Sequence, residues 1–533
     1  MKISLSYLFF GLIVGFLLFV RIINLGQNPV SLYWDELAIG IDAYSLAKIG
    51  LDIHGHNWLQ AIFLSYGDYK APVAIWLVSL SVRLFSLTPF AVRLPFALVW
   101  LSSVPVFYLL LKQLLPKNKI NTLVLNLSLV LFLATPWHFH FARIGFESGL
   151  SFCFLLWAVL FTFWGFSKKS FWLIPASLFG LISVYSYFSA RYVVPVFLGI
   201  IILVYWKQLW QKKIYLLLAV FIFVLGLLPL YLSPYYQASQ QYRLSTPSIL
   251  NSNQALSESA NLIEQSGNSL AARLFYHRYF FIARELLNNY LPYFSIDFLF
   301  LQGDPNLRHH SGWGGQLLAI TAIPLLFGLY WLFKNWKSKT TIILIICLLV
   351  APITAALPYE PYHASRSIYM LLPLMGIAAL GFGQLLAQLP NRLSNLAFLL
   401  LLLAIALNSL LYLEDYFIHY PARSAQAWQL GNTYIGQAVA EYKNDYDHIF
   451  VDSAYWQPAL AVVFYNPKLI VDIQEHGNNN DWVKQIGKIS FGLDETKQPE
   501  DHSLYLSSKK LSGKIIQNYV FPDGSEALYA ISR

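Results

Sequence analysis

Two adjacent carboxylates, Asp35 and Glu36, lie in the stretch Tyr33-Trp34-Asp35-Glu36, about ten residues after the first long apolar run. Carboxylates are costly to remove from water and contribute little to apolar packing. They can occupy a solvated loop, or they can supply a catalytic base, because a carboxylate takes up the proton of a hydroxyl group that attacks. The residues on the same side of the membrane decide between these two interpretations.

The composition predicts a membrane protein. Of 533 residues, 57% are hydrophobic and 12% are charged, whereas soluble proteins carry roughly a quarter charged residues. Long apolar runs recur along most of the chain, which is typical of a polytopic helical membrane protein. The net charge of +9 arises from scattered Lys and Arg between these runs, so we do not expect nucleic acid as a partner. Both cysteines, Cys153 and Cys347, fall inside apolar runs, and no disulfide framework is expected.

The apolar runs predict about eleven membrane spans, and the first is expected to be a retained anchor because it lacks a convincing small-residue cleavage site. The expected spans are residues 5–24, 94–111, 120–137, 149–166, 171–189, 193–206, 214–233, 316–333, 340–357, 367–388 and 394–413.

The distribution of positive charge decides the role of one further apolar stretch, residues 72–88, which Arg83 interrupts. If this stretch does not span and the N-terminus is cytoplasmic, the lysine clusters fall in cytoplasmic loops, as the positive-inside rule requires. We therefore expect 72–88 to be an interfacial amphipathic helix. The extracytoplasmic pieces are then 26–93, 134–148, 234–315 and 414–533.

The last of these pieces is polar and changes the character of the chain. We expect two domains, a transmembrane catalytic domain over 1–415 and a soluble extracytoplasmic α/β domain over 416–533. In the second domain we expect a helix over 424–442 and strands near 449–451, 469–471, 503–506 and 515–520. This domain could bind an acceptor or only cap the structure.

Several charged groups gather on the predicted outer face, while the spans themselves carry almost no charge. Tyr69 and Lys70 directly precede the interfacial helix, where an ammonium group can reach a lipid phosphate or simply snorkel. Arg143 and Glu147 are four residues apart, so on a helix they could pair with each other or face a substrate. Arg191 and Arg366 end outer helices and could bind phosphate or lipid headgroups.

The loop Gly303 to Gly312 combines turn formers with the ionisable residues Asp304, Arg308, His309 and His310. A divalent metal held by Asp304, His309 and His310 is the less favoured interpretation, because adjacent histidines are weak evidence for a metal site. We therefore predict no firm metal or cofactor, and assign Asp304, Arg308 and His309 to substrate binding.

Taken together, these residues resemble those of the GT-C membrane glycosyltransferases, in particular the protein O-mannosyltransferase and aminoarabinose transferase superfamily (glycosyltransferase family 39 and its bacterial relatives). The resemblance covers about residues 1–415 and is distributed over Trp34-Asp35-Glu36, Tyr69-Lys70-Ala71-Pro72, Arg93-Leu94-Pro95, Arg143 with Glu147, and the stretch from Gly303 to His309. Relatives often show Lys-Pro-Pro where this chain has Lys70-Ala71-Pro72. The acid Glu147 is also displaced from the aspartate of some relatives.

The resemblance implies inverting transfer of a sugar from a polyprenyl-phosphate donor, with Asp35 as the general base. It also implies that Lys70 and Arg191 bind the donor phosphate. From the residues themselves we assign Glu36 and Glu147 as further catalytic carboxylates, and Tyr69, Arg143 and Arg366 to substrate binding. We expect a multi-pass hexosyl- or pentosyltransferase of the plasma or inner membrane, whose acceptor is a protein, lipid or glycan. The alternatives are a lipid-linked sugar transporter or flippase, which the nearly uncharged spans disfavour, and a polysaccharide ligase or polymerase that uses a diphosphate-linked donor.

Overall fold

The computed structural model describes residues 5–119, 121–245, 249, 253–359, 362–452, 454–470, 483–492 and 502–533. The chain forms two compact units, each assembled from separate segments. The first unit comprises residues 1–17, 102–140 and 151–412, and the second comprises 18–101, 141–150 and 413–533. The division predicted from composition, at residue 415, stays a prediction.

Apolar helices dominate the chain, which confirms the predicted fold class. In the described part of the chain, six helices are long and apolar enough to cross a bilayer: Pro89–Leu114, Glu147–Ser167, Lys213–Tyr231, Lys339–Ala356, Ile368–Leu386 and Arg392–Ser424. Shorter apolar helices cover Leu8–Phe19, Pro72–Phe85, Thr122–Ala134, Ser170–Val184, Ala190–Val204 and Ala319–Lys334. Every predicted span coincides with one of these helices, but the number of spans stays a prediction.

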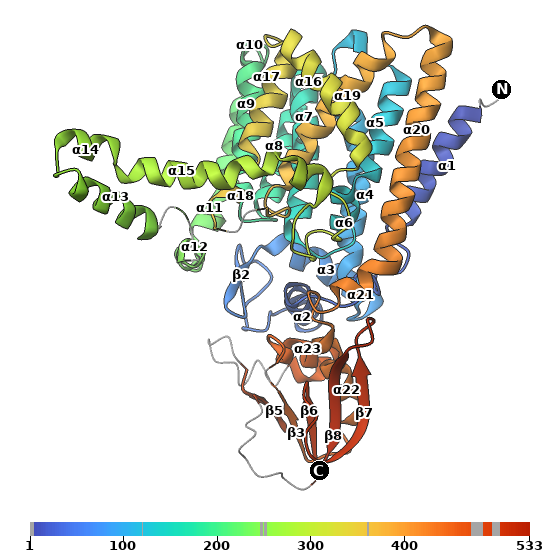
Figure 1. The fold of residues 1–533 in the computed structure, drawn as a ribbon, viewed down its shortest axis with the longest axis vertical. Coiled ribbons are helices and arrows are strands. Elements are labelled where there is room, and N and C mark those ends of the chain that lie inside the picture. The colour runs from blue at the N-terminus through green and yellow to red at the C-terminus, as the bar shows by residue number, and fades with distance from the viewer. Residues whose placement is uncertain are drawn as a thin grey trace. The chain divides into compact units, whose positions relative to one another are not determined.

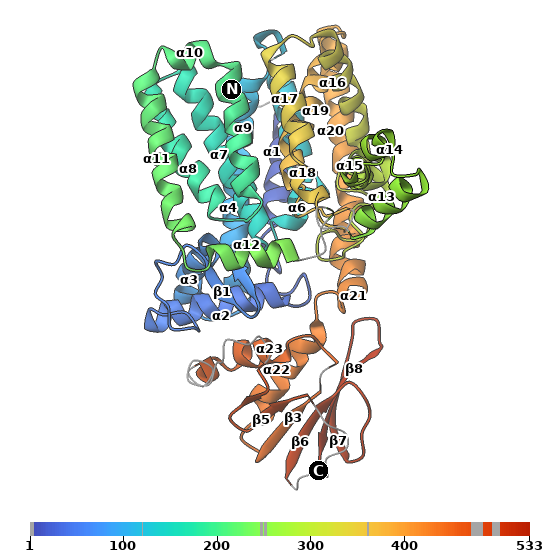
Figure 2. The same cartoon turned by 90° about the vertical axis from the view of Figure 1, so that its left-hand side faces the viewer.

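Two groups of helices pack side by side in the first unit. Figure 2 shows α7, α8, α9 and α11 as one group, and Figure 1 shows α16, α17 and α19 as another. The bounds of the helices in this unit are α1 (Leu5–Phe19), α4 (Pro89–Leu114), α5 (Thr122–Ala134), α6 (Pro136–Phe141), α7 (Glu147–Ser167), α8 (Leu173–Val184), α9 (Ala190–Val204), α10 (Trp206–Trp210), α11 (Lys213–Tyr231), α12 (Tyr236–Ser245), α16 (Ala322–Lys334), α17 (Lys339–Val350), α18 (Ile353–Ala356), α19 (Leu371–Leu386) and α20 (Asn391–Glu414); α1, α4, α6, α7 and α20 extend beyond the unit's boundaries.

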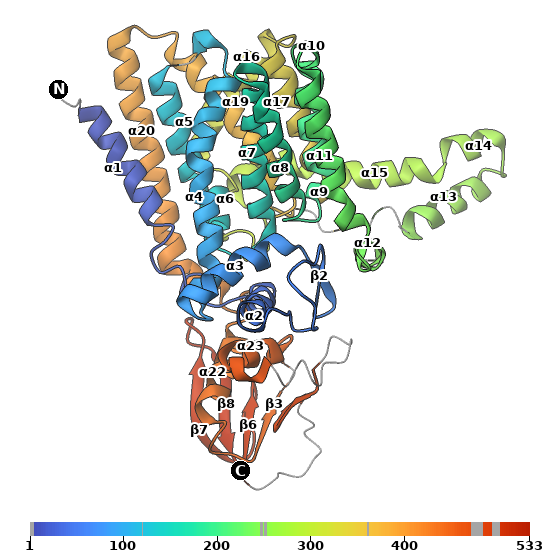
Figure 3. The same ribbon diagram turned by 180° about the vertical axis from the view of Figure 1, so that it is seen from behind.

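A helical arm leaves this unit between α12 and α16. It consists of α13 (Asn253–Gln265), α14 (Leu270–Phe275) and α15 (Arg278–Tyr290). In Figures 1 and 3 the arm runs across the direction of α16 and α17 and not along it. The arm falls within the predicted outer piece 234–315.

The second unit begins with the loop that carries Asp35 and Glu36. Helix α2 (Trp34–Ile49) starts directly at these carboxylates, and acidic residues in a first turn are favourable there because of the positive end of the helix dipole. A hairpin of β1 (Phe63–Ser65) and β2 (Asp68–Lys70) follows, and α3 (Pro72–Phe85) begins with a proline at its first position. The helix predicted over 72–88 is therefore present; its place at an interface stays a prediction.

The C-terminal part of the second unit is an α/β domain, as predicted. Its sheet has the order β4-β5-β3-β6-β8-β7, in which β3 is parallel to β5 and β6 and the other pairs are antiparallel. Helices α22 (Leu430–Tyr442) and α23 (Pro458–Tyr465) accompany the sheet (Figure 3). The strands are β3 (His448–Val451), β4 (Gln485–Ile486), β5 (Ile489–Phe491), β6 (Ser503–Ser507), β7 (Lys514–Val520) and β8 (Glu526–Ser532).

The details of this domain depart from the sequence-based expectation at two places. The predicted strand 469–471 is wrong at Leu469, which ends a short 3-10 helix from Pro467, while Val471 lies outside the described residues. The helix predicted from 424 begins instead at Leu430, because Gln429 has a positive φ of 54° that interrupts helical geometry.

The C-terminal domain packs directly against the Asp35 loop. The Oγ of Ser31 and the Oγ1 of Thr433 are 2.6 Å apart, and the Asn28 side chain donates to the carbonyl of Tyr416 at 2.9 Å. A Cβ on Gly40 of α2 would lie 3.0 Å from the Phe464 ring of α23. The domain therefore helps to position the residues of the predicted site.

Close helix packing in the first unit yields a stability prediction. A Cβ on Gly381 of α19 would collide with the carbonyl oxygen of Pro324 in α16, a close approach that small residues allow between membrane helices. We expect Gly381→Val to lower the stability of the detergent-solubilised protein by about 1–3 kcal/mol, measured as a decrease in Tm. Gly199→Ala is the control because a Cβ there meets nothing within 4 Å. Equal Tm values for the two variants would contradict the packing.

Candidate active site

Asp35 and Glu36 follow one another in the first turn of α2 but have different surroundings. Successive residues of a helix point about 100° apart, since 3.6 residues make one turn. The Asp35 side chain is 27% exposed and forms an ion pair with Lys70, whereas the Glu36 side chain is fully buried. Only Asp35 of this pair is therefore accessible to a reactant.

Lys70 lies at the end of the hairpin, where the register places it opposite Phe63. Its Nζ contacts Asp35, lies 3.4 Å from the Oδ2 of Asp68 and is 4.9 Å from the centre of the Trp34 ring. Burial alone would lower the pKa of Lys70, but the charges of Asp35, Asp68 and Glu147 outweigh it and raise the pKa. Lys70 is thus an ammonium group among three carboxylates. The neighbouring Tyr69 is half-buried and points to the opposite face of the strand.

Glu147 begins α7 and binds the backbone beside Lys70. Its Oε1 accepts a hydrogen bond from the Ala71 N–H at 2.9 Å. A proline at position 71 would have no N–H to donate. The departure from Lys-Pro-Pro at Ala71 therefore supplies the hydrogen bond that holds Glu147 in this chain.

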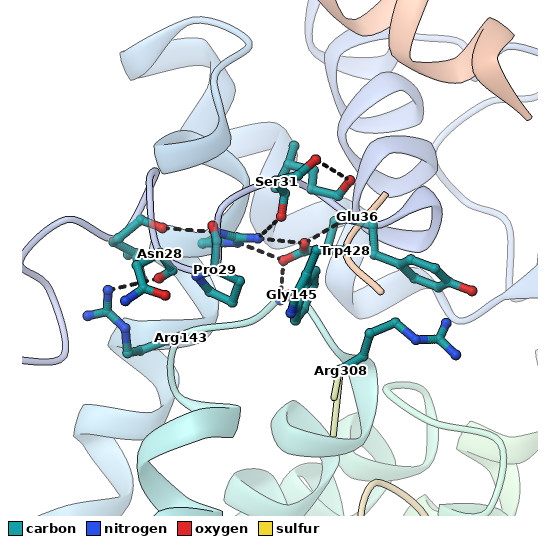
Figure 4. A network of polar contacts seen from close by, with 12 residues as sticks. Asn28, Pro29, Ser31, Glu36, Arg143, Gly145, Arg308 and Trp428 are labelled. Atoms are coloured by element: carbon teal, nitrogen blue, oxygen red, sulfur yellow. Dashed lines mark hydrogen bonds and ion pairs between the residues drawn. The ribbon is translucent and has the colours of Figure 1, made fainter. Parts of the chain in front are cut away.

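Glu36 lies in a network of polar contacts that includes Gly145 (Figure 4). Its ion pair with Arg93 of α4 is buried. The Nε and Nη2 of Arg93 each lie 2.9 Å from an oxygen of Glu36, and the Gly145 N–H donates to Glu36 at 2.7 Å. A Cβ at position 145 would lie 2.9 Å from the Glu36 side chain, so the contact needs glycine. The expected catalytic role of Glu36 does not fit this arrangement, because both of its oxygens already have buried partners.

Arg93 also organises the chain that precedes α2. Its guanidinium donates to the carbonyls of Leu25 at 3.3 Å, Pro29 at 2.8 Å and Ser31 at 2.5 Å. The Cζ of Arg93 also lies 5.4 Å from the centre of the Trp428 ring. We did not predict a role in the site for Arg93. The available signal was a single arginine at the start of a long apolar run, where a charge requires a buried partner.

Arg143 is buried in a similar way and is not presented to a substrate. Its guanidinium donates to the carbonyls of Val20 at 2.7 Å and Asn28 at 2.9 Å, and the side chain is 0% exposed. Residues 142–146 are not helical, so the face expected to join Arg143 and Glu147 does not form. Both predicted uses of Arg143, pairing with Glu147 and substrate binding, therefore do not fit the structure.

Another buried carboxylate, Asp42, lies two turns after Asp35 on α2. One of its oxygens accepts a weak hydrogen bond from the Ile53 N–H at 3.4 Å. Burial raises the pKa of Asp42 well above its ordinary range, and the charge of Asp52 adds to this effect, although the Ile53 hydrogen bond and Lys70 oppose it. Asp42 therefore favours its protonated form more than an ordinary aspartate does.

The remaining predicted site residues lie in the first unit. Asp304 accepts hydrogen bonds from the Ala364 N–H at 2.7 Å and pairs with the Nδ1 of His309 at 3.0 Å. Arg308 and Arg366 are half-buried, and both raise the positive potential at His363. Burial, His309, Arg366 and Arg308 lower the pKa of His363 well below its ordinary value. Arg191 is half-buried at the start of α9, with its guanidinium 4.7 Å from the Phe188 ring.

Asp304, His309 and His363 form the group that could hold a metal ion among the described residues. Each offers one ligand atom, and these atoms lie within 4.8 Å of one another. The metal interpretation weighed from the sequence used Asp304, His309 and His310. The structure brings the first two together, but His310 is not part of this group, and its ring bonds instead to the carbonyl of Gly315 and the N–H of Gly312. His363, absent from that interpretation, comes from a loop 54 residues later in the chain.

Comparisons with known proteins agree on the fold. Residues 69–231 match the family of dolichyl-phosphate-mannose-protein mannosyltransferases. No curated protein matches the chain in sequence. The structure is similar to ArnT from Cupriavidus metallidurans in the apo state, with a TM-score of 0.56 and 12% identity over 99% of this chain and 98% of ArnT.

Two further solved structures share the fold. ArnT of the same organism bound to undecaprenyl phosphate gives a TM-score of 0.54 and 12% identity, over 98% of this chain and 97% of that one. The archaeal oligosaccharyltransferase AglB from Archaeoglobus fulgidus, in complex with an inhibitory peptide and a dolichol-phosphate, gives a TM-score of 0.50 and 11% identity. This match covers 86% of this chain and 63% of AglB. The chain therefore has the GT-C fold, and the predicted resemblance to the GT-C glycosyltransferases is confirmed.

The Glu36–Arg93 pair yields a prediction on stability. Arg93→Met leaves a buried carboxylate without its partner, which costs about 3–5 kcal/mol, so we expect a large decrease in Tm or loss of folded protein. Arg83→Met, at an exposed arginine, is the matched control. The double variant Glu36→Gln/Arg93→Met should recover part of the loss. An Arg93→Met protein as stable as the Arg83→Met protein would contradict the buried pair.

Asp42 yields a prediction on pH. When the pKa of a carboxyl group is higher in the folded chain than in the unfolded chain, the folded chain binds more protons. Stability therefore falls as the pH rises above about 4, the ordinary pKa of aspartate. Asp42→Asn removes this fall, and its Tm should exceed that of the wild type by more at pH 8 than at pH 5. Asp445→Asn, at an exposed site, should show no such difference. A constant Tm difference at both pH values would refute the buried protonation site.

Proposed function

We propose that this protein is an integral-membrane glycosyltransferase that moves a sugar from a polyprenyl-phosphate donor to a hydroxyl acceptor, with inversion at the anomeric carbon. The GT-C fold and the partial match to mannosyltransferases support the class of reaction. ArnT with undecaprenyl phosphate and AglB with a dolichol-phosphate support a lipid-linked donor. The reaction would take place on the extracytoplasmic face, with the N-terminus in the cytoplasm.

The observation that carries this proposal is the different environment of the two adjacent carboxylates. Asp35 is partly exposed and contacts Lys70, while Glu36 is enclosed by Arg93 and Gly145. A general base must reach the proton that it removes. Asp35 meets this requirement, and Glu36 instead fixes the start of the helix that carries Asp35.

The proposed chemistry balances one bond formed against one bond broken. Asp35 takes the proton of the acceptor hydroxyl while the hydroxyl oxygen bonds to the anomeric carbon of the sugar. The bond between that carbon and the phosphate oxygen breaks, and its electron pair leaves with polyprenyl phosphate. The phosphate gains negative charge in this step, and a fixed cation stabilises it most where water is excluded. Lys70, which is 4% exposed, is the cation next to the base.

The carboxylates around Lys70 give it two roles in this scheme. Lys70 neutralises part of the charge of Asp35 and Asp68, which it contacts. When a donor phosphate approaches, the same ammonium group can turn toward it, since Lys is a flexible point charge with three donors. Glu147 would act indirectly, because its carboxylate holds the Ala71 N–H directly after Lys70.

The first unit supplies a separate cationic group. Arg308, His309 and Arg366 lie near Asp304 and His363, and we propose that the two half-buried guanidinium groups bind an anionic group of a substrate. Asp304 would orient His309 within this group. Arg191 stays a candidate phosphate ligand on its position at the start of α9 alone.

The base assignment predicts a rate effect without a fold effect. We expect Asp35→Asn to lower the rate of polyprenyl-phosphate release from a polyprenyl-phosphate-sugar donor by about 10²–10⁴-fold, because an amide cannot accept the proton. Its Tm should stay close to that of the wild type, since the amide oxygen that replaces the carboxylate can still contact Lys70. Asp523→Asn, at an exposed turn, should retain the full rate. A well-folded Asp35→Asn protein with wild-type turnover would exclude Asp35 as the base.

A further inference from the structure

The helical arm exposes an unusually apolar surface at its far end. Five large apolar side chains of α14 and α15 are 60% to 77% exposed: Leu270, Leu274, Phe275, Tyr279 and Phe280. This segment is predicted to lie outside the membrane core, and large apolar patches that face water are rare. We therefore expect another molecule or surface to cover these side chains.

The exposed apolar residues are distinct from the residues that form the small core of the arm. Phe281 is only 2% exposed, and Ala255 and Ala272 are also buried. The Ser259 hydroxyl donates to the carbonyl of Tyr276 at 2.5 Å, and Arg284 pairs with Glu258 at 2.7 Å between α15 and α13. The arm is thus a packed helical hairpin, and its exposed apolar residues form a second face.

The same end of the arm is positively charged. Residues 266–280 contain Arg273, Arg278 and His277 but no Asp or Glu, and all three basic residues are exposed. Apolar and aromatic side chains next to arginines are typical of segments that lie in the membrane interface, where the rings enter the headgroup region and the cations meet lipid phosphates.

The base of the arm is fixed at the end of a membrane-spanning helix. The Tyr290 hydroxyl donates to the carbonyl of Leu349 at 2.6 Å, and the Tyr293 hydroxyl donates to that of Ala355 at 3.0 Å. Both acceptors belong to the last turns of the apolar stretch Lys339–Ala356. In Figures 1 and 3 the arm runs across the direction of α17. The two hydrogen bonds place the base of the arm where the apolar stretch Lys339–Ala356 ends.

We propose that the arm binds the surface of the lipid bilayer. Leu270, Leu274, Phe275, Tyr279 and Phe280 insert at the boundary of headgroups and acyl chains, and the basic residues bind the phosphates of anionic lipids. This anchor holds α15 in the plane of the membrane beside the span to which it is bonded. The proposal concerns the arm alone and does not depend on glycosyl transfer.

The full-length protein in lipid nanodiscs tests this proposal. The natural cysteines, Cys153 and Cys347, are buried, so a thiol-reactive fluorophore can be placed selectively at Leu274→Cys. Gln265→Cys, at an exposed polar position of α13, is the matched control. The nanodiscs contain phosphatidylcholine with or without phosphatidylglycerol, plus a lipid with a nitroxide near its headgroup. Aqueous iodide is the second quencher.

We expect the nitroxide lipid to quench the label at 274 several-fold more strongly than the label at 265, and iodide to show the reverse order. The charge reversal Arg273→Glu/Arg278→Glu should weaken lipid quenching at 274 more in discs that contain phosphatidylglycerol than in discs without it. Equal access of iodide to both labels would overturn the proposal, because the face would then stand in water. A label at 274 shielded from both quenchers would also overturn it, and would indicate a protein partner or a second copy.

Discussion

The buried ion pair between Glu36 and Arg93 fixes the path of the chain around the candidate site. One guanidinium group neutralises Glu36 and binds the carbonyls of Leu25, Pro29 and Ser31. Glu36 in turn binds the Gly145 N–H, so the segment before α2, the start of α4 and the loop before α7 meet at one carboxylate. A buried charge without such partners would cost several kcal/mol. This requirement orients the first turn of α2 and leaves Asp35 at the accessible side.

Several separate segments of the chain supply the groups around Lys70. The hairpin delivers Lys70 and Asp68 together, α2 supplies Asp35, and the Ala71 N–H holds Glu147. Three carboxylates around one ammonium group leave an excess of negative charge before a donor binds.

The sequence was sufficient to predict the fold class, a helix at each of the eleven expected spans and three of the six described strands of the C-terminal sheet, namely β3, β6 and β7. Apolar run length and strand alternation are local properties, which is why these elements could be predicted. Contacts between distant segments were not accessible in the same way. The roles of Arg93 and Arg143 depend on carbonyl groups more than 60 residues away, and His363 joins Asp304 only in three dimensions. The split between Asp35 and Glu36 also depends on such contacts, although a helix start does predict that adjacent residues point apart.

The identity of the lipid product tests the central claim most directly. The purified protein in proteoliposomes would be supplied with lipid-linked sugar donors and an acceptor extract, and the lipids would be analysed by mass spectrometry after turnover. We predict one polyprenyl monophosphate released for each sugar transferred, and no such release by Asp35→Asn. Release of a polyprenyl diphosphate would instead indicate a ligase or polymerase. Movement of intact donor across the bilayer without cleavage would contradict a transferase and indicate a flippase.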